Sequence, residues 1–337
     1  MIIMTNQEEA KNFNALNILA GGDYRKLKII LEKHKSWSEA WKKNNDGKIN
    51  CEKEWDKLKS LGIRIILKED EQYPALLKEI DWPPFALYIK GSLPAKKTVA
   101  IVGTRKATAI GRAFAQNLAK ELSVNDISVV SGLALGIDEA AHWGAVKARA
   151  ETIAVLPTGL DRIYPNQNAG LAEKILESGG ALISEYPIGT TSYPSNFIHR
   201  NRIVSGLCIG TVIIEAPEKS GSLTTAKFAL QQNREVFIAP GPVNHPNYKA
   251  SHSLIRAGAR LVTSAEEILD DLNLDFKKQN NYESINTTLN EEEKQILETI
   301  KENGWPIAID KIHQKTKIDI PKINRIITFL TIKGLIK

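Results

Sequence analysis

Two arginines stand close to an aromatic residue in the middle of the chain. Phe197 is followed within a few residues by Arg200 and Arg202. A guanidinium presents a fork of N–H donors that matches the oxygens of a phosphate or a carboxylate. This spacing favours an anion-binding site. It is equally compatible with a turn that carries two surface arginines.

A loop of small residues follows the next apolar segment. Residues 211–214 read as a buried strand, and Ser220, Gly221 and Ser222 come just before an expected helix at 224–232. The first turn of a helix has N–H groups without partners and the positive end of the helix dipole, so it suits an anion. The pattern favours a groove for phosphate groups, with a tight βα turn as the plain alternative.

Patterns for other chemistry are missing at the expected strand ends. The turn after the first strand is Gly103-Thr104-Arg105 and the next glycine is Gly111, so the Gly-x-Gly-x-x-Gly fingerprint of dinucleotide sites is absent. Asp138 and His142 would share a helix face, where a structural hydrogen bond is favoured over a metal or acid–base pair. Because no nucleophile has a matching base, we predict that the chain is not an enzyme and has no catalytic residue, metal or cofactor.

Length and composition describe a globular chain with more than one domain. The 337 residues exceed what one core usually holds, and 42% apolar with 25% charged residues is ordinary for a soluble protein. The sequence has no apolar run of about 18 residues and no secretory leader pattern, so we expect neither a membrane span nor export. Cys51 and Cys208 show no disulfide or metal pattern, which fits a reducing cytoplasm.

Positive charge is concentrated around the arginines and the Ser-Gly-Ser loop. The formal net charge is +6, yet residues 1–82 carry 15 Lys/Arg against 14 Asp/Glu. Between Asn196 and Arg260 there are 8 Lys/Arg against 3 Asp/Glu, a local excess of +5. Such an excess favours an anionic partner, although chance clustering on a solvated face gives the same count.

Short apolar segments alternate with helical patterns from residue 98 onward. The expected strands are 99–102, 127–130, 152–156, 181–183, 211–214 and 236–239, and the expected helices include 111–122, 138–148, 168–177 and 224–232. Such alternation predicts an α/β fold with a doubly wound, mostly parallel sheet. Ligands of these sheets lie beyond the carboxyl ends of the strands. All six expected strands end in small or polar residues, so one continuous rim is predicted there.

Composition divides the chain into four parts. Residues 1–72 read as a small helical domain of the helix-hairpin-helix or SAM-like type, with a plain packed helical pair favoured over a DNA-binding one. Residues 73–275 hold the strand-rich domain, 276–288 form a polar linker, and 289–337 read as three helices of a winged-helix-like domain. The second wing strand is missing or very short, so protein contact is as well supported there as reading of duplex DNA.

Ordered motifs at the strand ends carry a family resemblance. They run from Gly-x-Arg at 103–105 through Ser-Gly-x-Ala-x-Gly-Ile-Asp at 131–138, Gly-x-Asp-x-x-Tyr-Pro at 159–165 and Arg-Asn-Arg-Ile-x-Ser-Gly-Leu at 200–207 to Ser-Gly-Ser-Leu-x-Thr-Ala at 220–226 and Val-Phe-x-x-Pro-Gly at 236–241. Together they resemble the DNA-processing protein family DprA, also called Smf. The sequence departs from that pattern at Phe197-Ile198, where Phe-Pro is common.

The resemblance implies an extended Rossmann-like fold that binds single-stranded DNA rather than a dinucleotide. Proteins of that family protect incoming strands during natural transformation, help to load the RecA recombinase for recombination, and typically form homodimers. Carried over by motif, the DNA contacts would be cations, loop donors and one ring that stacks on a base. These residues are Arg105, Arg200, Arg202 and Lys227, then Ser131, Gly132, Ser220, Gly221 and Ser222, and finally Phe197.

Two other functions stay open as alternatives. A Rossmann-like nucleotide phosphoribohydrolase uses a similar Gly-rich loop followed by a catalytic Glu. The matching position here is Lys227, whereas an oxocarbenium-like centre needs a carboxylate. The second alternative is a regulator that binds duplex DNA through residues 289–337.

Overall fold

The computed structural model of the chain describes residues 2–276, 289–304, 306–332 and 336. Contacts between Cα atoms divide the chain into two compact units, Met1–Phe276 and Lys277–Lys337. The predicted linker at 276–288 lies outside the described residues except for Phe276. None of the described helices combines the length and the apolar character needed to cross a bilayer.

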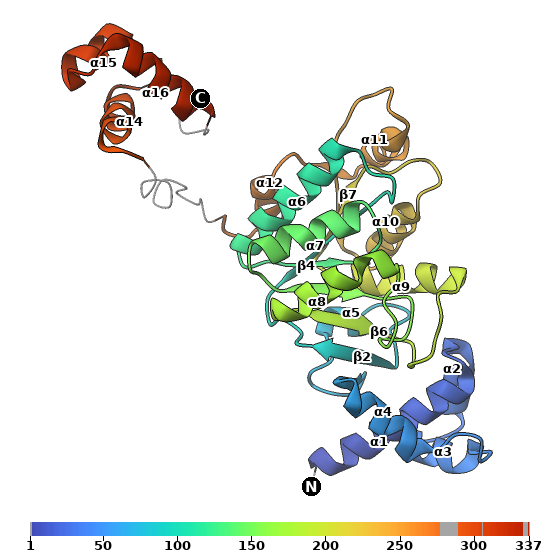
Figure 1. Cartoon of the computed structure of the whole chain (residues 1–337). Coiled ribbons are helices and arrows are strands. Elements are labelled where there is room, and N and C mark those ends of the chain that lie inside the picture. The colour runs from blue at the N-terminus through green and yellow to red at the C-terminus, as the bar shows by residue number, and fades with distance from the viewer. Residues whose placement is uncertain (1, 277–288, 305, 333–335, 337) are drawn as a thin grey trace. The chain divides into compact units, whose positions relative to one another are not determined.

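One sheet runs through the first unit (Figure 1). Within the described residues it has nine strands in the order β1-β2-β6-β5-β4-β3-β7-β8-β9. The pairs β1–β2 and β2–β6 are antiparallel and all other neighbours are parallel. The strands are β1 (Ile63–Leu67), β2 (Ala86–Gly91), β3 (Thr98–Gly103), β4 (Ser128–Ser131), β5 (Thr152–Val155), β6 (Ala181–Ser184), β7 (Gly210–Ile214), β8 (Glu235–Ile238) and β9 (Arg260–Leu261).

The predicted α/β fold with a doubly wound, mostly parallel sheet is confirmed. Strands β3 to β8 lie within one or two residues of the six expected segments, because each is a continuous apolar run buried on both faces. Strand β1 was not expected, since residues 1–72 read as helical. It pairs with β2, so the N-terminal part shares both a sheet and a compact unit with the residues that follow.

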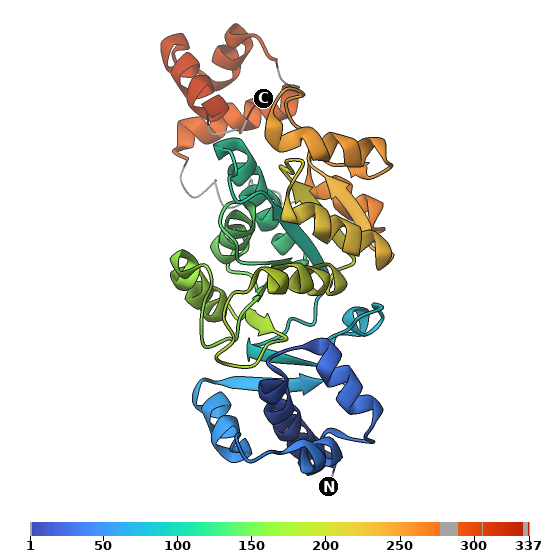
Figure 2. The ribbon, with the colours of Figure 1, turned by 90° about the vertical axis from the view of Figure 1, so that its right-hand side faces the viewer.

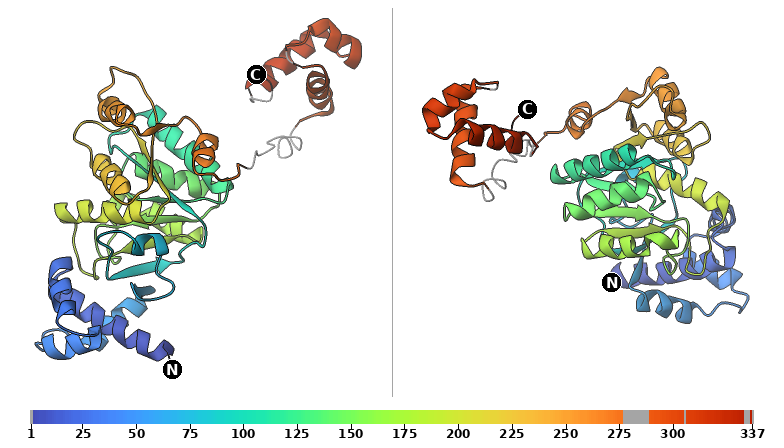
Figure 3. Two further views of the ribbon diagram at one scale, coloured as in Figure 1. Left: turned by 180° about the vertical axis from the view of Figure 1, so that it is seen from behind. Right: turned by 45° about the horizontal axis from the view of Figure 1, so that its top comes forward.

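Helices cover both faces of the sheet. Figures 1 and 3 show α6, α7 and α8 side by side on one face. Helices α5, α9, α10 and α11 pack on the other face through residues such as Ile203, Ala226 and Ala250. The bounds are α5 (Ala75–Lys78), α6 (Ala109–Val124), α7 (Ile137–Lys147), α8 (Ala169–Glu177), α9 (Pro194–Gly206), α10 (Gly221–Gln231), α11 (Lys249–Arg256) and α12 (Ala265–Asp271), with the short 3₁₀ turns η1 (Asn166–Asn168) and η2 (Pro246–Tyr248).

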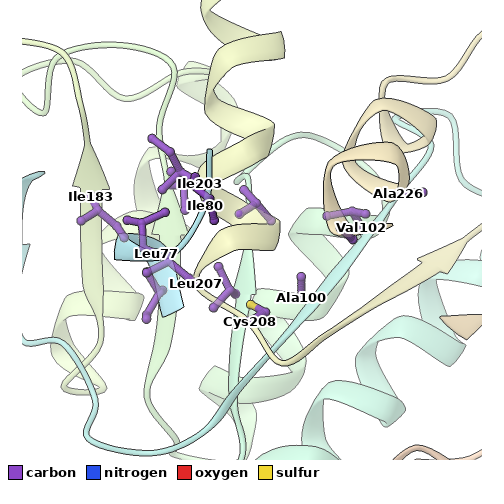
Figure 4. Packing of buried hydrophobic residues seen from close by; sticks show 14 of the residues in the cluster. Leu77, Ile80, Ala100, Val102, Ile183, Ile203, Leu207, Cys208 and Ala226 are labelled. Atoms are coloured by element: carbon purple, nitrogen blue, oxygen red, sulfur yellow. The ribbon is translucent and has the colours of Figure 1, made fainter. Parts of the chain in front are cut away.

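Buried apolar side chains hold helix α9 against the sheet and set the distance between them. Figure 4 shows Ile203 and Leu207 close to Leu77 and Ile80. A Cβ on Gly206 would come within 2.9 Å of Leu77 Cδ1, so the glycine permits the close approach. Each large apolar side chain buried here contributes about 1.5–3 kcal/mol. The side chains at the start of α9 are therefore placed by its buried second half.

Four N-terminal helices pack against the β1–β2 edge of the sheet (Figure 2). They are α1 (Ile2–Ala20), α2 (Tyr24–Glu32), α3 (Trp37–Asn44) and α4 (Cys51–Ser60). The buried hydroxyl of Tyr88 in β2 donates to Asn14 Oδ1 at 3.0 Å and accepts from Asn17 Nδ2 at 3.1 Å. This polar contact ties α1 to the sheet.

The second unit is helical in its described part. It contains α14 (Glu291–Asn303), α15 (Ile309–Thr316) and α16 (Ile320–Ile332), which pack around Ile296, Ile312 and Ile323. The three helices of the predicted domain are thus present. The wing, expected at the very end of the chain, falls largely on residues 333–335 and 337, outside the described residues.

Candidate functional site

A groove of about 370 Å³ opens beyond the carboxyl ends of β3, β4 and β7. Strands β4 to β6, which follow β3 in the sequence, lie on one side of β3, and β7 to β9 lie on its other side. The strand order therefore reverses at β3. Such switch points are where open α/β sheets hold their ligands. The rim predicted over six strand ends is therefore concentrated at three of them.

Seven of the ten predicted residues line this groove, whereas Ser131, Arg202 and Lys227 do not. The seven are Arg105, Gly132, Phe197, Arg200, Ser220, Gly221 and Ser222. They come from the ends of β3 and β4, the first turns of α9 and the start of α10. The fold thus assembles segments that are distant in the sequence.

A cation and a ring form one wall of the groove, and a second ring lies against them. The exposed Arg105 places its guanidinium carbon 5.1 Å from the ring centre of Phe197. Tyr164 meets Phe197 edge-on, with ring centres 5.4 Å apart and planes at 74°. Phe197 is half-buried, so it is neither a full core residue nor a free surface ring. Charge and aromatic surface therefore lie in direct contact here.

Arg200 is a buried cation at the floor of the groove. Its Nη1 donates to the carbonyl oxygens of Gly132 and Val155, and its Nε donates to Asn201 Oδ1 at 3.2 Å. Its Nη2 makes no hydrogen bond to the described residues. A Cβ on Gly132 would fall 2.4 Å from the guanidinium carbon, so only glycine fits there. The groove floor is built around this close approach.

A buried acid balances the charge of Arg200. Asp138 Oδ2 accepts from the backbone N–H of Gly132 at 3.1 Å. Burial raises the pKa of Asp138, while the attraction of Arg200 opposes that shift. Burial likewise lowers the pKa of Arg200 to about 10, with Asp138 opposing, so the guanidinium stays charged at neutral pH.

The donors predicted after β4 are already used inside the protein. Ser131 is fully buried and its hydroxyl donates to the carbonyl of Ile101 at 2.6 Å. The N–H of Gly132 is taken by Asp138. Both residues therefore shape the groove, and neither offers these donors to a ligand.

The environment of Arg202 does not fit the prediction that this residue meets phosphate. Its side chain is 1% exposed and bonds both oxygens of Glu185, at 2.8 and 2.7 Å. It also lies over the ring of Trp82 at 4.2 Å. On α9, two residues beyond Arg200, it points into a different environment. A desolvated, fully paired guanidinium is a structural group.

The start of α10 forms the opposite wall. Ser220 caps the helix, because its Oγ accepts from the N–H of Ser222 at 3.3 Å. Asn201 Nδ2 donates to the carbonyl of Gly221 at 3.2 Å and so links α9 to this loop. Gly221 is exposed, and a Cβ there would meet no atom within 4 Å. The loop is open to a ligand at the positive end of the α10 dipole.

Two lysines near α10 have different positions. Lys219 is exposed and lines the groove. Lys227, two turns into α10, is exposed but lies outside the lining. The position where a phosphoribohydrolase would carry its acid is therefore an outward-facing cation.

A second buried acid organises the loops beside the groove. The carboxylate of Glu215, just after β7, accepts from the N–H of Thr108 and Nδ2 of Asn247, each at 2.9 Å, and from the hydroxyl of Tyr248 at 3.2 Å. Burial alone would raise the pKa of Glu215, but these hydrogen bonds outweigh it and lower the pKa. The acid supports the β7 end and is already engaged by neighbouring donors.

Sequence reasoning missed Lys219 and Asn201 as groove residues and Tyr164 as the ring beside Phe197. Tyr164 belongs to the motif at 159–165, and Lys219 directly precedes the Ser-Gly-Ser loop, so both had a signal in the sequence. Asn201 had none, because its role depends on the distance between α9 and α10. Of the charged residues lining the groove, Arg105, Arg200 and Lys219 outnumber Asp138. The groove therefore suits an anionic ligand.

Comparison with known proteins agrees with the motifs. Residues 64–273 match the sequence model of the family described as DNA recombination-mediator protein A. Protein Smf of Escherichia coli is 43% identical over 211 residues, which cover 62% of this chain and 56% of that protein. DNA processing protein DprA of Bacillus subtilis is 41% identical over 214 residues, which cover 63% of this chain and 72% of that protein. The match to the Escherichia coli relative thus spans little more than half of its length.

Solved structures show the same fold. DNA processing protein A of Streptococcus pneumoniae is similar with a TM-score of 0.63 at 36% identity, covering 72% of this chain and 82% of that one. DNA processing protein A of Helicobacter pylori, whose structure is described in terms of a single-stranded DNA binding mode, is similar with a TM-score of 0.57 at 30% identity, covering 64% of this chain and 97% of that one. The match to the family over more than half of the sequence shows that this chain belongs to the DNA recombination-mediator protein A family, the DprA or Smf proteins.

Proposed function

We propose that the groove binds single-stranded DNA without sequence preference. The observation that carries this proposal is the contact of Arg105 with Phe197, 5.1 Å from guanidinium carbon to ring centre, in a groove that ends at the start of α10. A single strand offers a phosphate and a free base face at every nucleotide. The groove pairs a cation with a ring in the same way.

Phosphates would lie along the cationic side of the groove. Arg105 and Lys219 are exposed there, and Nη2 of Arg200 is unused by the described residues. The N-terminus of α10 adds N–H groups and the positive end of its dipole. Ser131 and Arg202 act from behind the groove, holding β4 and α9 in place. Lys227 is assigned only a long-range attraction, because it lies outside the lining.

Bases would meet the Phe197–Tyr164 pair. Base–aromatic stacking is worth about 1–3 kcal/mol per base and tolerates any sequence. A duplex hides its base faces within the stack, so it offers the groove phosphates alone. Single strands are therefore favoured over duplex DNA.

Family membership supports a wider role for the chain. We infer that the chain protects single strands in the cytoplasm, acts in natural transformation and recombination, loads the RecA recombinase and works as a homodimer. The support is the resemblance over residues 64–273. Faster RecA-dependent strand exchange on coated single strands tests the loading role, and sedimentation tests the dimer. Unchanged exchange would remove RecA from the proposal and leave DNA binding intact.

Replacing Arg105 tests the groove directly. Arg105→Ala should weaken binding of all single-stranded sequences alike and should make the dependence of log K on log salt shallower by roughly one phosphate contact. Lys120→Ala on α6 removes another exposed cation, one outside the groove, and should bind like the wild type. Equal salt slopes and affinities for Arg105→Ala and the wild type would place the DNA elsewhere.

A further inference from the structure

A second pocket lies on the other side of α9. It has a volume of about 440 Å³, within the range of about 300–1,000 Å³ that small-molecule sites occupy. It is bounded by the turn between α1 and α2, by Trp82 and by the N-terminal half of α9. Its walls carry five rings, those of Tyr24, Trp82, Tyr186, Tyr193 and His199. Nothing in the proposed groove uses these rings.

Helix α9 brings the two pockets close together. Phe197, Ile198 and Arg200 face the groove, whereas Ser195, Asn196 and His199 face the second pocket. The two sets alternate around the first turns of one helix, and a helix with its side chains is about 10 Å across. A DNA strand with several nucleotides bound in the groove is long enough to pass the start of α9 and reach both pockets.

The ring of Tyr193 is available to a ligand. It is 61% exposed at the mouth of the pocket, just before α9, and within the described residues it contacts no other ring. Its neighbours differ, since Tyr24 stacks on Phe85 at 4.6 Å and His199 meets Trp82 edge-on at 4.9 Å. Those contacts leave Tyr193, rather than Tyr24 or His199, free to act as a platform for a ligand.

The polar groups of the pocket lining include one unpartnered donor, one exposed cation and one helix cap. Trp82 Nε1 is buried and has no hydrogen-bond partner in the described part of the chain, although a buried indole N–H normally finds an acceptor. Arg25 is exposed at the rim, while the Asp23 carboxylate accepts from the N–H groups of Arg25 and Lys26 as a helix cap. Burial lowers the pKa of His199, so its ring is neutral at pH 7.

The two pockets differ in the net charge of their lining residues. The second pocket has one arginine and one aspartate, so their charges cancel, while the groove has an excess of cations. Its rings rather than its charge would hold a ligand. A nucleobase has the flat face for Tyr193, and the phosphate of its nucleotide would reach Arg25 at the rim.

We propose that the second pocket takes a nucleobase of the same single strand that occupies the groove, with Tyr193 as its stacking platform. The inference rests on the proposed function and extends the DNA path around the start of α9. It assigns the turn at Gly21 and Gly22, between the first two helices, to DNA binding. A strand too short to pass α9 would fill the groove alone.

Binding of oligo-dT of two lengths to the full chain tests the path. With about 16 nucleotides, Tyr193→Ala should lose about 5- to 150-fold in affinity, the equivalent of one stacked base. With about four nucleotides it should bind like the wild type, because the groove suffices. Tyr193→Phe keeps the ring and should match the wild type at both lengths. Arg25→Ala should weaken only the longer strand, and its neighbour Lys26→Ala, which is exposed but outside the lining, should not.

The outcomes separate this inference from the proposed function. If Tyr193→Ala binds both lengths like the wild type while Arg105→Ala weakens both, the second pocket is off the path and the groove stands. An equal loss at both lengths would place Tyr193 in the groove and also overturn the inference. If the wild type binds neither length, both proposals fail. Competition by an aromatic peptide but not by longer dT would assign the pocket to a protein partner instead.

Discussion

Three arginines of one family motif set have three different environments. Arg105 is exposed beside Phe197. Arg200 is buried under the groove, and its Nη2 has no hydrogen-bond partner among the described residues. Arg202 is buried against Glu185. The family motifs predicted phosphate contact for all three. Their surroundings leave Arg105 open to a ligand, leave Nη2 of Arg200 without a partner among the described residues, and pair Arg202 within the fold.

Phe197 separates stacking from simple packing. Phe197→Ala should reduce single-strand affinity by about 1–3 kcal/mol, and the loss should vary little with salt because no phosphate charge is involved. Phe197→Leu keeps much of the apolar volume and loses the ring face, so it should bind almost as poorly. Titrations with poly-dT at several salt concentrations measure both. Wild-type binding by Phe197→Leu, with only a lower melting temperature for Phe197→Ala, would show that the ring is a core plug.

Arg202 should affect stability rather than the salt dependence of binding. Arg202→Ala leaves Glu185 buried without its partner, which typically costs about 3–5 kcal/mol of unfolding free energy. Denaturant unfolding measures this loss. Arg105→Ala, an exposed-site control, should stay within about 0.5 kcal/mol of the wild type. A stable Arg202→Ala chain with weaker, less salt-dependent DNA binding would return Arg202 to the phosphate-binding set.

Helix α7 carries a buried histidine that links stability to pH. His142 Nδ1 lies 2.9 Å from Thr152 Oγ1, which itself donates to the carbonyl of Val129 at 2.6 Å. The histidine must therefore donate through Nδ1, which leaves Nε2 bare and without a partner among the described residues. Burial lowers the pKa of His142 to about 3, followed by the repulsion of Arg200.

The sign of this pH effect follows from the unfolded chain. Between pH 6.5 and 3 the histidine is protonated in the unfolded chain and neutral in the folded chain. The free energy of unfolding therefore falls as the pH drops below about 6.5. At pH 5 this site alone should cost about 2 kcal/mol relative to pH 7. Unfolding of the wild type and of His142→Gln at both pH values measures it. An equal pH dependence in the two proteins would show that His142 is not the source.

The regular elements were predictable where one pattern dominated. Strands β3 to β8 are continuous apolar runs, and α6, α7, α8 and α10 follow helical periodicity, so their positions agree with expectation. Helix α9 was not predicted, because its buried Arg200 and Arg202 break the apolar stripe that marks a helix. Strand β1 is a short apolar segment inside a helical region, and its pairing with β2 is a tertiary contact.

The site was predictable in composition and only partly in arrangement. Seven predicted residues do line the groove, because strand ends of a parallel sheet meet at one edge. Whether a donor is free depends on contacts across the fold. Ser131 bonds Ile101, thirty positions away in the chain, and Arg202 bonds Glu185 from another loop. No local pattern carries such information.

The whole chain contains a first unit that holds every groove residue. That unit ends at Phe276, and Leu274 and Phe276 pack against its core. A fragment of residues 1–276 should therefore fold and keep single-strand affinity within about tenfold of the full chain, a difference of about 1.4 kcal/mol. Binding of poly-dT to both proteins measures this. A larger loss in a folded fragment would place binding residues in the second unit.

A salt-dependent titration of the full chain with poly-dT and with a duplex of matched length tests the central claim most directly. The groove predicts tighter binding of poly-dT at every salt concentration, with a log–log slope that reports a few released counterions. It also predicts that the preference for poly-dT persists at high salt, because stacking on Phe197 is not screened. Equal or tighter binding of the duplex would contradict the account.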